Sequence, residues 1–64
     1  METRYRITET IDKKIFRDGM VLFRNSVAYA SVPVWSFFVG RNEKDVLENC
    51  KQRGYKVEKK NAND

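Results

Sequence analysis

Apolar and polar side chains alternate over residues 4–11, and this period of two is the signature of a half-buried β-strand. One side of the expected strand is apolar and carries Tyr5, Ile7 and Ile11. The other side is polar and carries Arg4, Arg6, Thr8 and Thr10. We therefore expect a first strand here, followed by a turn at Asp12 and Lys13.

Two further apolar runs are separated by Asp18-Gly19. This dipeptide is a strong hairpin signal, because a type I′ turn needs a positive φ at both of its central residues. The pattern predicts strands at about residues 14–17 and 20–24, with the hairpin turn at Asp18-Gly19 between them. Asn25 and Ser26 then mark another break in the chain.

Residues 27–39 are rich in β-branched and aromatic side chains, which favour strands. Pro33 has no backbone N–H to donate, so it is expected at an edge, a bulge or a break between two short strands. Residues 34–39 read Val-Trp-Ser-Phe-Phe-Val and are predicted to form a strand that ends at Gly40. Trp35 is expected in the core, because its neighbours at alternate positions are apolar.

A helix is predicted at about residues 43–53, with Asn42 as its N-cap and Gly54 as the residue that ends it. Acidic side chains favour its first half and basic ones its end, as the helix dipole prefers. Its apolar stripe consists of Val46, Leu47 and Cys50. Cys50 is therefore expected to be a core residue. A short last strand is predicted at residues 55–57.

These elements indicate the α+β class: a small antiparallel sheet of three to five strands, with the one C-terminal α-helix packed on one face. We expect residues 1–58 to form a single domain and residues 59–64 a flexible polar tail. A chain of 64 residues has room for one core only. It buries roughly 60% of the surface that the unfolded chain exposes, so its stability margin is thin.

The residue combinations that usually carry catalysis are missing. The chain has no histidine and a single cysteine, so a disulfide within the chain and a structural zinc site are both excluded. Serine and cysteine nucleophiles lack their usual histidine base, and the acids are explained by turns and by the start of the helix. We therefore expect no enzyme activity, no catalytic or metal-binding residues, no cofactor and no small-molecule substrate.

The first residues lack the apolar stretch of a signal peptide, and no run approaches the roughly 18 apolar residues of a membrane span. The expected location is cytoplasmic, with no membrane partner. The formal net charge is +4, and residues 1–41 contribute +3 of it, from seven basic and four acidic side chains. The predicted helix is neutral. The excess positive charge therefore belongs mainly to the predicted sheet.

A single helix covers one face of a small sheet and leaves the other face open. We expect this second face to bind a protein partner that has an acidic surface, with the chain acting as an accessory or inhibitor protein, either alone or as a homodimer. The expected contact residues are Arg4, Arg6, Arg17, Arg24 and Phe38.

Two alternatives remain open at the level of the sequence. The same basic and aromatic surface is compatible with nucleic acid, where arginine contacts phosphate and a ring stacks on a base. The modest net charge and the lack of an RNA-recognition signature favour a protein partner. In the second alternative, residues 27–32 fold over Val34 and Phe38, and Arg4 and Arg6 are ordinary solvated charges.

Overall fold

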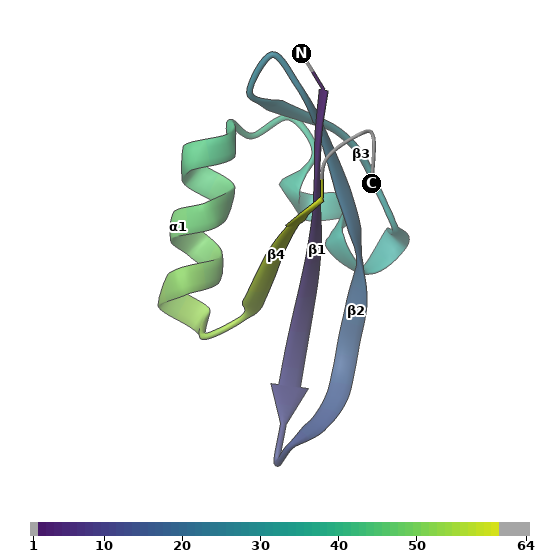
Figure 1. The fold of residues 1–64 in the computed structure, drawn as a ribbon, viewed down its shortest axis with the longest axis vertical. Helices are drawn as coiled ribbons and strands as arrows, with labels where there is room; N and C mark the ends of the chain where they lie inside the picture. Colours follow the sequence, from purple (N-terminus) through teal and green to yellow (C-terminus); the bar gives the residue numbers. More distant parts are fainter. Residues whose placement is uncertain (1, 61–64) are drawn as a thin grey trace.

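The computed structural model describes residues 2–60, which form a four-stranded antiparallel sheet and two helical segments (Figure 1). The strands are β1 (Glu2–Ile11), β2 (Lys14–Arg24), β3 (Val27–Ser31) and β4 (Lys56–Lys60). A 3-10 segment, η1 (Pro33–Phe38), and one helix, α1 (Glu43–Arg53), lie between β3 and β4. The strand order across the sheet is β3-β2-β1-β4, and all neighbours are antiparallel. The predicted α+β class is confirmed.

Two tight turns connect the first three strands. Asp12 and Lys13 have φ values of 53° and 66°, and Asn25 and Ser26 have φ values of 53° and 65°. A positive φ at both central residues is what the right-handed twist of a hairpin requires. The turn predicted at Asp12 and Lys13 is thus present, and it closes the β1–β2 hairpin.

The hairpin predicted at Asp18-Gly19 is wrong, because both residues lie inside the continuous strand β2. Gly19 pairs with Ile7 of β1. A Cβ atom at Gly19 would lie 2.3 Å from Cγ2 of Val32, a separation at which one of the two groups must move. The glycine therefore allows Val32 to approach the strand, and it makes no turn.

The strand predicted at residues 34–39 is also wrong, because Pro33–Phe38 form the 3-10 segment η1, kinked at Trp35. Pro33 stands at the start of η1, where a missing N–H has no intrahelical partner to lose. Trp35 and Phe38 are its buried residues. A spacing of three residues places both on one side of a 3-10 turn, whereas in a strand they would face opposite sides.

The helix α1 has the predicted bounds and the predicted caps. Oδ1 of Asn42 accepts a hydrogen bond from the backbone N–H of Asp45 at 2.8 Å. Gly54 ends the helix in the left-handed region, with φ of 74°. Both signals are local in sequence, which explains why the helix could be placed without any knowledge of the sheet.

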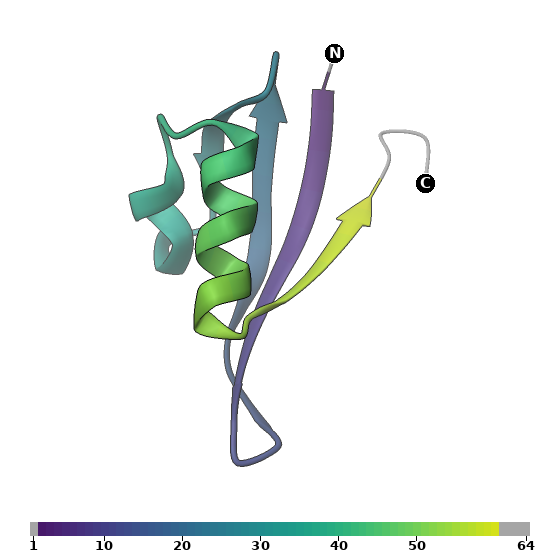
Figure 2. The same ribbon diagram turned by 90° about the vertical axis from the view of Figure 1, so that its left-hand side faces the viewer.

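The core lies between the sheet and the two helical segments, all on one side of the sheet (Figure 2). Its fully or nearly fully buried side chains are Tyr5, Ile7, Val21, Phe23, Ala28, Trp35, Phe38, Val46 and Cys50. Cys50 is confirmed as a core residue, and burial raises the pKa of its thiol to about 11. No helix in residues 2–60 has the length and apolar content to cross a membrane.

The last strand extends beyond its prediction. It runs from Lys56 to Lys60 and pairs with residues 4–8 of β1. Lys59 and Lys60, predicted to belong to the polar tail, are therefore part of the sheet. The rest of that predicted tail, residues 61–64, lies outside the described residues.

Candidate functional site

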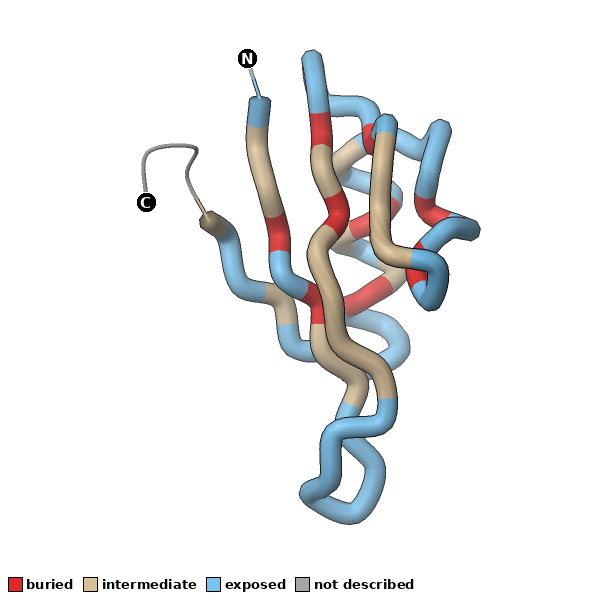
Figure 3. Tube along the Cα trace, turned by 90° about the vertical axis from the view of Figure 1, so that its right-hand side faces the viewer, coloured by how far each residue is buried: buried red, intermediate tan, exposed pale blue. Residues whose placement is uncertain are grey.

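The helical segments of residues 2–60 leave one side of the sheet uncovered, which Figure 3 faces and which we call the open face. The strand register arranges its side chains in three rows that run across the strands. The rows are Ala30-Leu22-Arg4-Lys60, then Met20-Arg6-Glu58, then Asp18-Thr8-Lys56. Four strands thus contribute to one surface, in an order that only the sheet topology could reveal.

The open face is divided into an apolar half and a basic half. The apolar half lies on β2 and β3, where Met20, Leu22 and Ala30 are partly exposed. Together with Glu2, Arg4, Ser31 and Val32 they line a hollow of about 460 Å³. The basic half lies on β1 and β4 and carries four cations, Arg4, Arg6, Lys56 and Lys60, and one acid, Glu58, whose Oε2 lies 3.6 Å from Nζ of Lys60.

Arg6 is oriented by neighbours on the same face. Its guanidinium donates two hydrogen bonds to the Asp18 carboxylate, at 3.0 and 2.6 Å, and the Thr8 hydroxyl donates a third at 2.9 Å. The bonds from Arg6, and then that from Thr8, lower the pKa of Asp18 to about 2. About half of the Arg6 side chain (48%) remains exposed. A guanidinium has five N–H donors, so this arginine keeps donors for a further acceptor.

Arg24 lies at the end of the face nearest the β2–β3 turn. Its guanidinium carbon lies 4.4 Å from the centroid of the Tyr29 ring, and its Nη2 lies 3.7 Å from Oε2 of Glu2. The Tyr29 hydroxyl donates to the same carboxylate, which lowers the pKa of Glu2. Arg4, Arg6 and Arg24 are therefore brought onto one face.

Arg17 does not belong to this face. Its Nε donates to Oε1 of Glu9 at 2.6 Å, and its Nη2 donates to the hydroxyl of Tyr55 at 3.2 Å. The guanidinium carbon lies 5.1 Å from the ring centroid of Trp35, on the side that the helices cover. The expectation that Arg17 shares a surface with Arg4 and Arg6 is wrong, because the register places Arg17 opposite Glu9 on the other side of the sheet.

Phe38 was expected on the open face, and this placement is wrong. Its side chain is fully buried in the core, with its ring stacked 5.7 Å from that of Trp35. Because Pro33–Phe38 turn as a 3-10 segment, Phe38 points toward the sheet from the covered side. The alternative that Phe38 is covered is therefore correct for this residue. The 3-10 turn of η1 buries it, and Val34 remains 41% exposed.

Sequence reasoning missed the apolar half of the open face. Met20 and Leu22 alternate with the buried Val21 and Phe23, so the period of two was present in the sequence. Which of the two sets faces the helix depends on the register with β1, where Leu22 lies opposite Arg4. The short alternation alone could not decide this.

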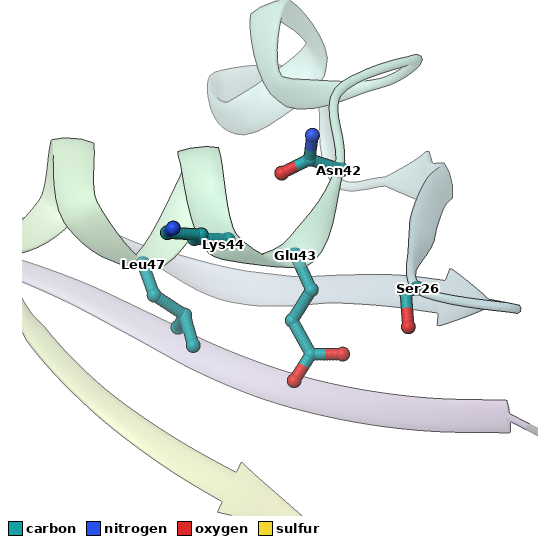
Figure 4. Close-up of a pocket in the computed structure, with 5 residues that line it drawn as sticks. All are labelled: Ser26, Asn42, Glu43, Lys44 and Leu47. Atoms are coloured by element: carbon teal, nitrogen blue, oxygen red, sulfur yellow. The ribbon is translucent and has the colours of Figure 1, made fainter.

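A second hollow, of about 530 Å³, lies where the β2–β3 turn meets the start of α1, and it is lined by Ser26, Asn42, Glu43, Lys44 and Leu47 (Figure 4). Its main polar groups already have structural roles. Asn42 caps the helix, and Glu43 accepts a hydrogen bond from the Tyr5 hydroxyl. Burial and this bond raise the pKa of Tyr5 to about 12. The polar residues of this hollow therefore cap α1 and join it to β1.

The carboxylates do not gather in one place. Glu9 and Asp18 are each paired with an arginine, on opposite sides of the sheet. Within residues 2–60, no three Asp, Glu, Cys or His side chains come close enough to hold a metal ion. Comparison with known proteins found no family model that matches the chain, and no curated protein or solved structure with significant similarity to it.

Proposed function

We propose that this chain is a small non-enzymatic accessory or inhibitor protein that docks on an acidic surface of a protein partner through the open face. One observation carries the proposal: an apolar strip of Met20, Leu22 and Ala30 lies beside a basic strip that includes Arg4 and Arg6. Arginine next to apolar groups is the composition that protein interfaces favour, since apolar contact supplies affinity and charge supplies orientation.

Charge favours a partner other than a second copy at this face. In a two-fold contact between two open faces, the basic half of one copy meets either the basic half or the apolar half of the other. Asp18 and Glu58 on this face are already paired with Arg6 and Lys60 of the same chain. The first arrangement therefore brings an excess of positive charge together, and the second places cations mainly against Met20, Leu22 and Ala30. A partner with carboxylates opposite Arg4 and Arg6 avoids both costs.

A protein partner is favoured over nucleic acid because the aromatic ring expected to stack on bases at this face is buried. Sheet surfaces that bind single-stranded nucleic acid stack bases on aromatic side chains. Phe38, the ring expected to serve in this way, is buried, and the Tyr29 ring is already occupied by Arg24. Met20 and Leu22 offer apolar contact without a flat ring.

The test begins with a photo-crosslinking amino acid placed at Leu22 on the open face and, as a control, at the exposed Gln52 of α1. The full chain is irradiated in extract of its native host. The protein attached at Leu22 and absent at Gln52 is then purified and titrated with the wild type and with the double variant Arg4→Gln/Arg6→Gln. Affinity is expected to fall by about 10- to 100-fold in the variant, and also with rising salt.

The matched control is Arg41→Gln/Lys44→Gln, which removes the same charge from exposed positions near the start of α1. It is expected to bind as the wild type does, and circular dichroism checks that both variants are folded. Equal affinity of the open-face variant and the wild type would contradict the proposal. Retardation of DNA or RNA that weakens steeply with salt, with no protein captured, would replace the protein partner by nucleic acid.

A further inference from the structure

The β1–β2 hairpin projects past the rest of the molecule (Figures 1 and 2). Within residues 2–60, strand β4 pairs with β1 only at residues 4–8, and β3 pairs with β2 only at residues 21–24. Residues 9–17 therefore pair only with each other, and we call them the finger. Figure 3 shows its far end as one exposed stretch.

The finger carries large apolar side chains that folding does not bury. Ile11, Ile15 and Phe16 are 49%, 65% and 64% exposed. They lie on both sides of the hairpin. Ile15 is paired with Thr10 and lines a hollow on the open face, whereas Phe16 lies beside Arg17, whose guanidinium is on the covered side. A register shift after Glu9 leaves Phe16 without a partner in β1, and such a bulge changes the direction of a side chain.

The base of the finger is held on both sides. On the covered side, Arg17 joins Glu9 to Tyr55 and lies over Trp35. On the open face, Asp18 next to the finger is bound by Arg6 and Thr8. The apolar tip is thus presented from a fixed base, and a contact element that is already ordered loses less entropy when it binds.

The tip is also positively charged. Lys13 follows the turn residue Asp12, and Lys14 begins β2. Neither lysine forms an ion pair with any described residue. Two free cations therefore stand within three residues of the exposed Phe16.

We propose that the finger inserts into an apolar cleft with an acidic rim on the same protein partner that the open face contacts. This inference rests on the proposed function and names the chemistry of a second part of the interface. Apolar side chains on both sides of a hairpin fit a cleft that encloses it, because a flat surface covers one side only. Carboxylates at the rim complement Lys13 and Lys14.

A second copy of the chain fits the finger less well. Two fingers side by side bring four lysines together. The bulge at Phe16 also interrupts the regular edge that strand-to-strand pairing needs. A cleft in another protein meets neither obstacle.

The experiment places the photo-crosslinking amino acid at Phe16, in parallel with Leu22 and Gln52. The expected result is that Phe16 and Leu22 capture the same protein and that Gln52 does not. Capture at Phe16 of another copy of the chain, of a different protein, or of nothing would overturn the inference. Capture at Phe16 with none at Leu22 would contradict the proposed function of the open face, and with it the part of the inference that gives the finger and the open face one partner.

Affinity measurements with the purified partner then show whether the apolar side chains of the tip matter more than exposed apolar side chains elsewhere. Ile15→Ser/Phe16→Ser is expected to weaken binding by about 10- to 100-fold, as for hot-spot residues. The control is Val34→Ser/Phe37→Ser, two η1 side chains that are 41% and 45% exposed, and it should bind as the wild type does. Lys13→Glu/Lys14→Glu should weaken binding most at low salt.

Three results would contradict the insertion of the finger into a partner cleft and leave the open-face proposal intact. The first is unchanged affinity of Ile15→Ser/Phe16→Ser when Arg4→Gln/Arg6→Gln is impaired. The second is sedimentation of the wild type, and not of the tip variant, with vesicles of equal parts phosphatidylcholine and phosphatidylserine. The third is a concentration-dependent dimer that the tip variant abolishes in analytical ultracentrifugation.

Discussion

The indole nitrogen of Trp35 donates a hydrogen bond to the backbone carbonyl of Ile7 at 3.1 Å, which joins η1 to the central strand β1. Both residues are fully buried. The same indole ring lies over Phe38 and under the guanidinium of Arg17. One side chain thus connects the 3-10 segment, the sheet and the base of the finger, and this explains why a segment of strand-like composition is held in a 3-10 conformation.

Replacing Trp35 by Phe should lower the free energy of unfolding by about 2–3 kcal/mol, from a lost hydrogen bond and unfilled core volume. Urea denaturation followed by far-ultraviolet circular dichroism measures the change. Phe37→Leu, at an exposed ring of the same segment, should shift it by less than about 0.5 kcal/mol. If the Trp35 substitution lowered the free energy of unfolding by as little as Phe37→Leu, the Trp35 contacts would not stabilise the fold.

Gly19→Ala should destabilise the protein by about 1–3 kcal/mol, because the new methyl group overlaps Val32. Val32→Ala removes the atoms that would clash. Combining the two substitutions should therefore cost less than the sum of the single effects, with a coupling of about 0.5–3 kcal/mol in a double-mutant cycle. Purely additive effects would show that the destabilisation by Gly19→Ala comes from strand geometry and not from the contact with Val32.

The Asp18 ion pair should make stability depend on pH in the acidic range. Hydrogen bonds from Arg6 and Thr8 lower the pKa of Asp18 from 3.8 to about 2. Because the folded-state pKa lies below the unfolded one, the stabilisation is present above about pH 4 and disappears as the pH falls toward 2. The difference in unfolding free energy between the wild type and Asp18→Asn should shrink over this range. A difference that stays constant from pH 6 to pH 2 would exclude the ion pair as its source.

The Cys50 thiol should react only when the protein opens. It is fully buried, and burial raises its pKa to about 11, so little reactive thiolate is present at neutral pH. Alkylation by iodoacetamide at pH 8 should be at least about 100-fold slower in native protein than in urea. A cysteine at the exposed position 52 of a Cys50→Ala variant is the control and should react at the rate of a free thiol. Fast native labelling of Cys50 would contradict its burial.

The residues that sequence reasoning placed correctly carry local signals. Asn42 and Gly54 bound the helix through hydrogen bonds and a left-handed φ within their own turns. The alternation of residues 4–11 also predicted correctly that Tyr5 and Ile7 face the core. For the same reason Arg4 and Arg6 could be assigned to the open face before the strand order was known.

The misplaced residues depend on partners far along the chain. The sequence around Gly19 predicts a turn, but the atoms that require a glycine belong to Val32. Arg17 is expected on the open face, but the regular register of β1 with β2 places it opposite Glu9, on the covered side. The strand-like composition of residues 34–39 predicts that Phe38 lies on the open face. The hydrogen bond from Trp35 to Ile7 holds this segment in a 3-10 conformation, which buries Phe38.

The amino-acid sequence by itself determined the α+β class, the helix with its two caps, and the absence of histidine and of a second cysteine, because composition and short-range hydrogen bonding settle these properties. Only the tertiary structure decided the strand order, the apolar half of the open face and the reach of the finger. Each of these follows from which strands pair and in what register, and that depends on how distant side chains fill one shared core.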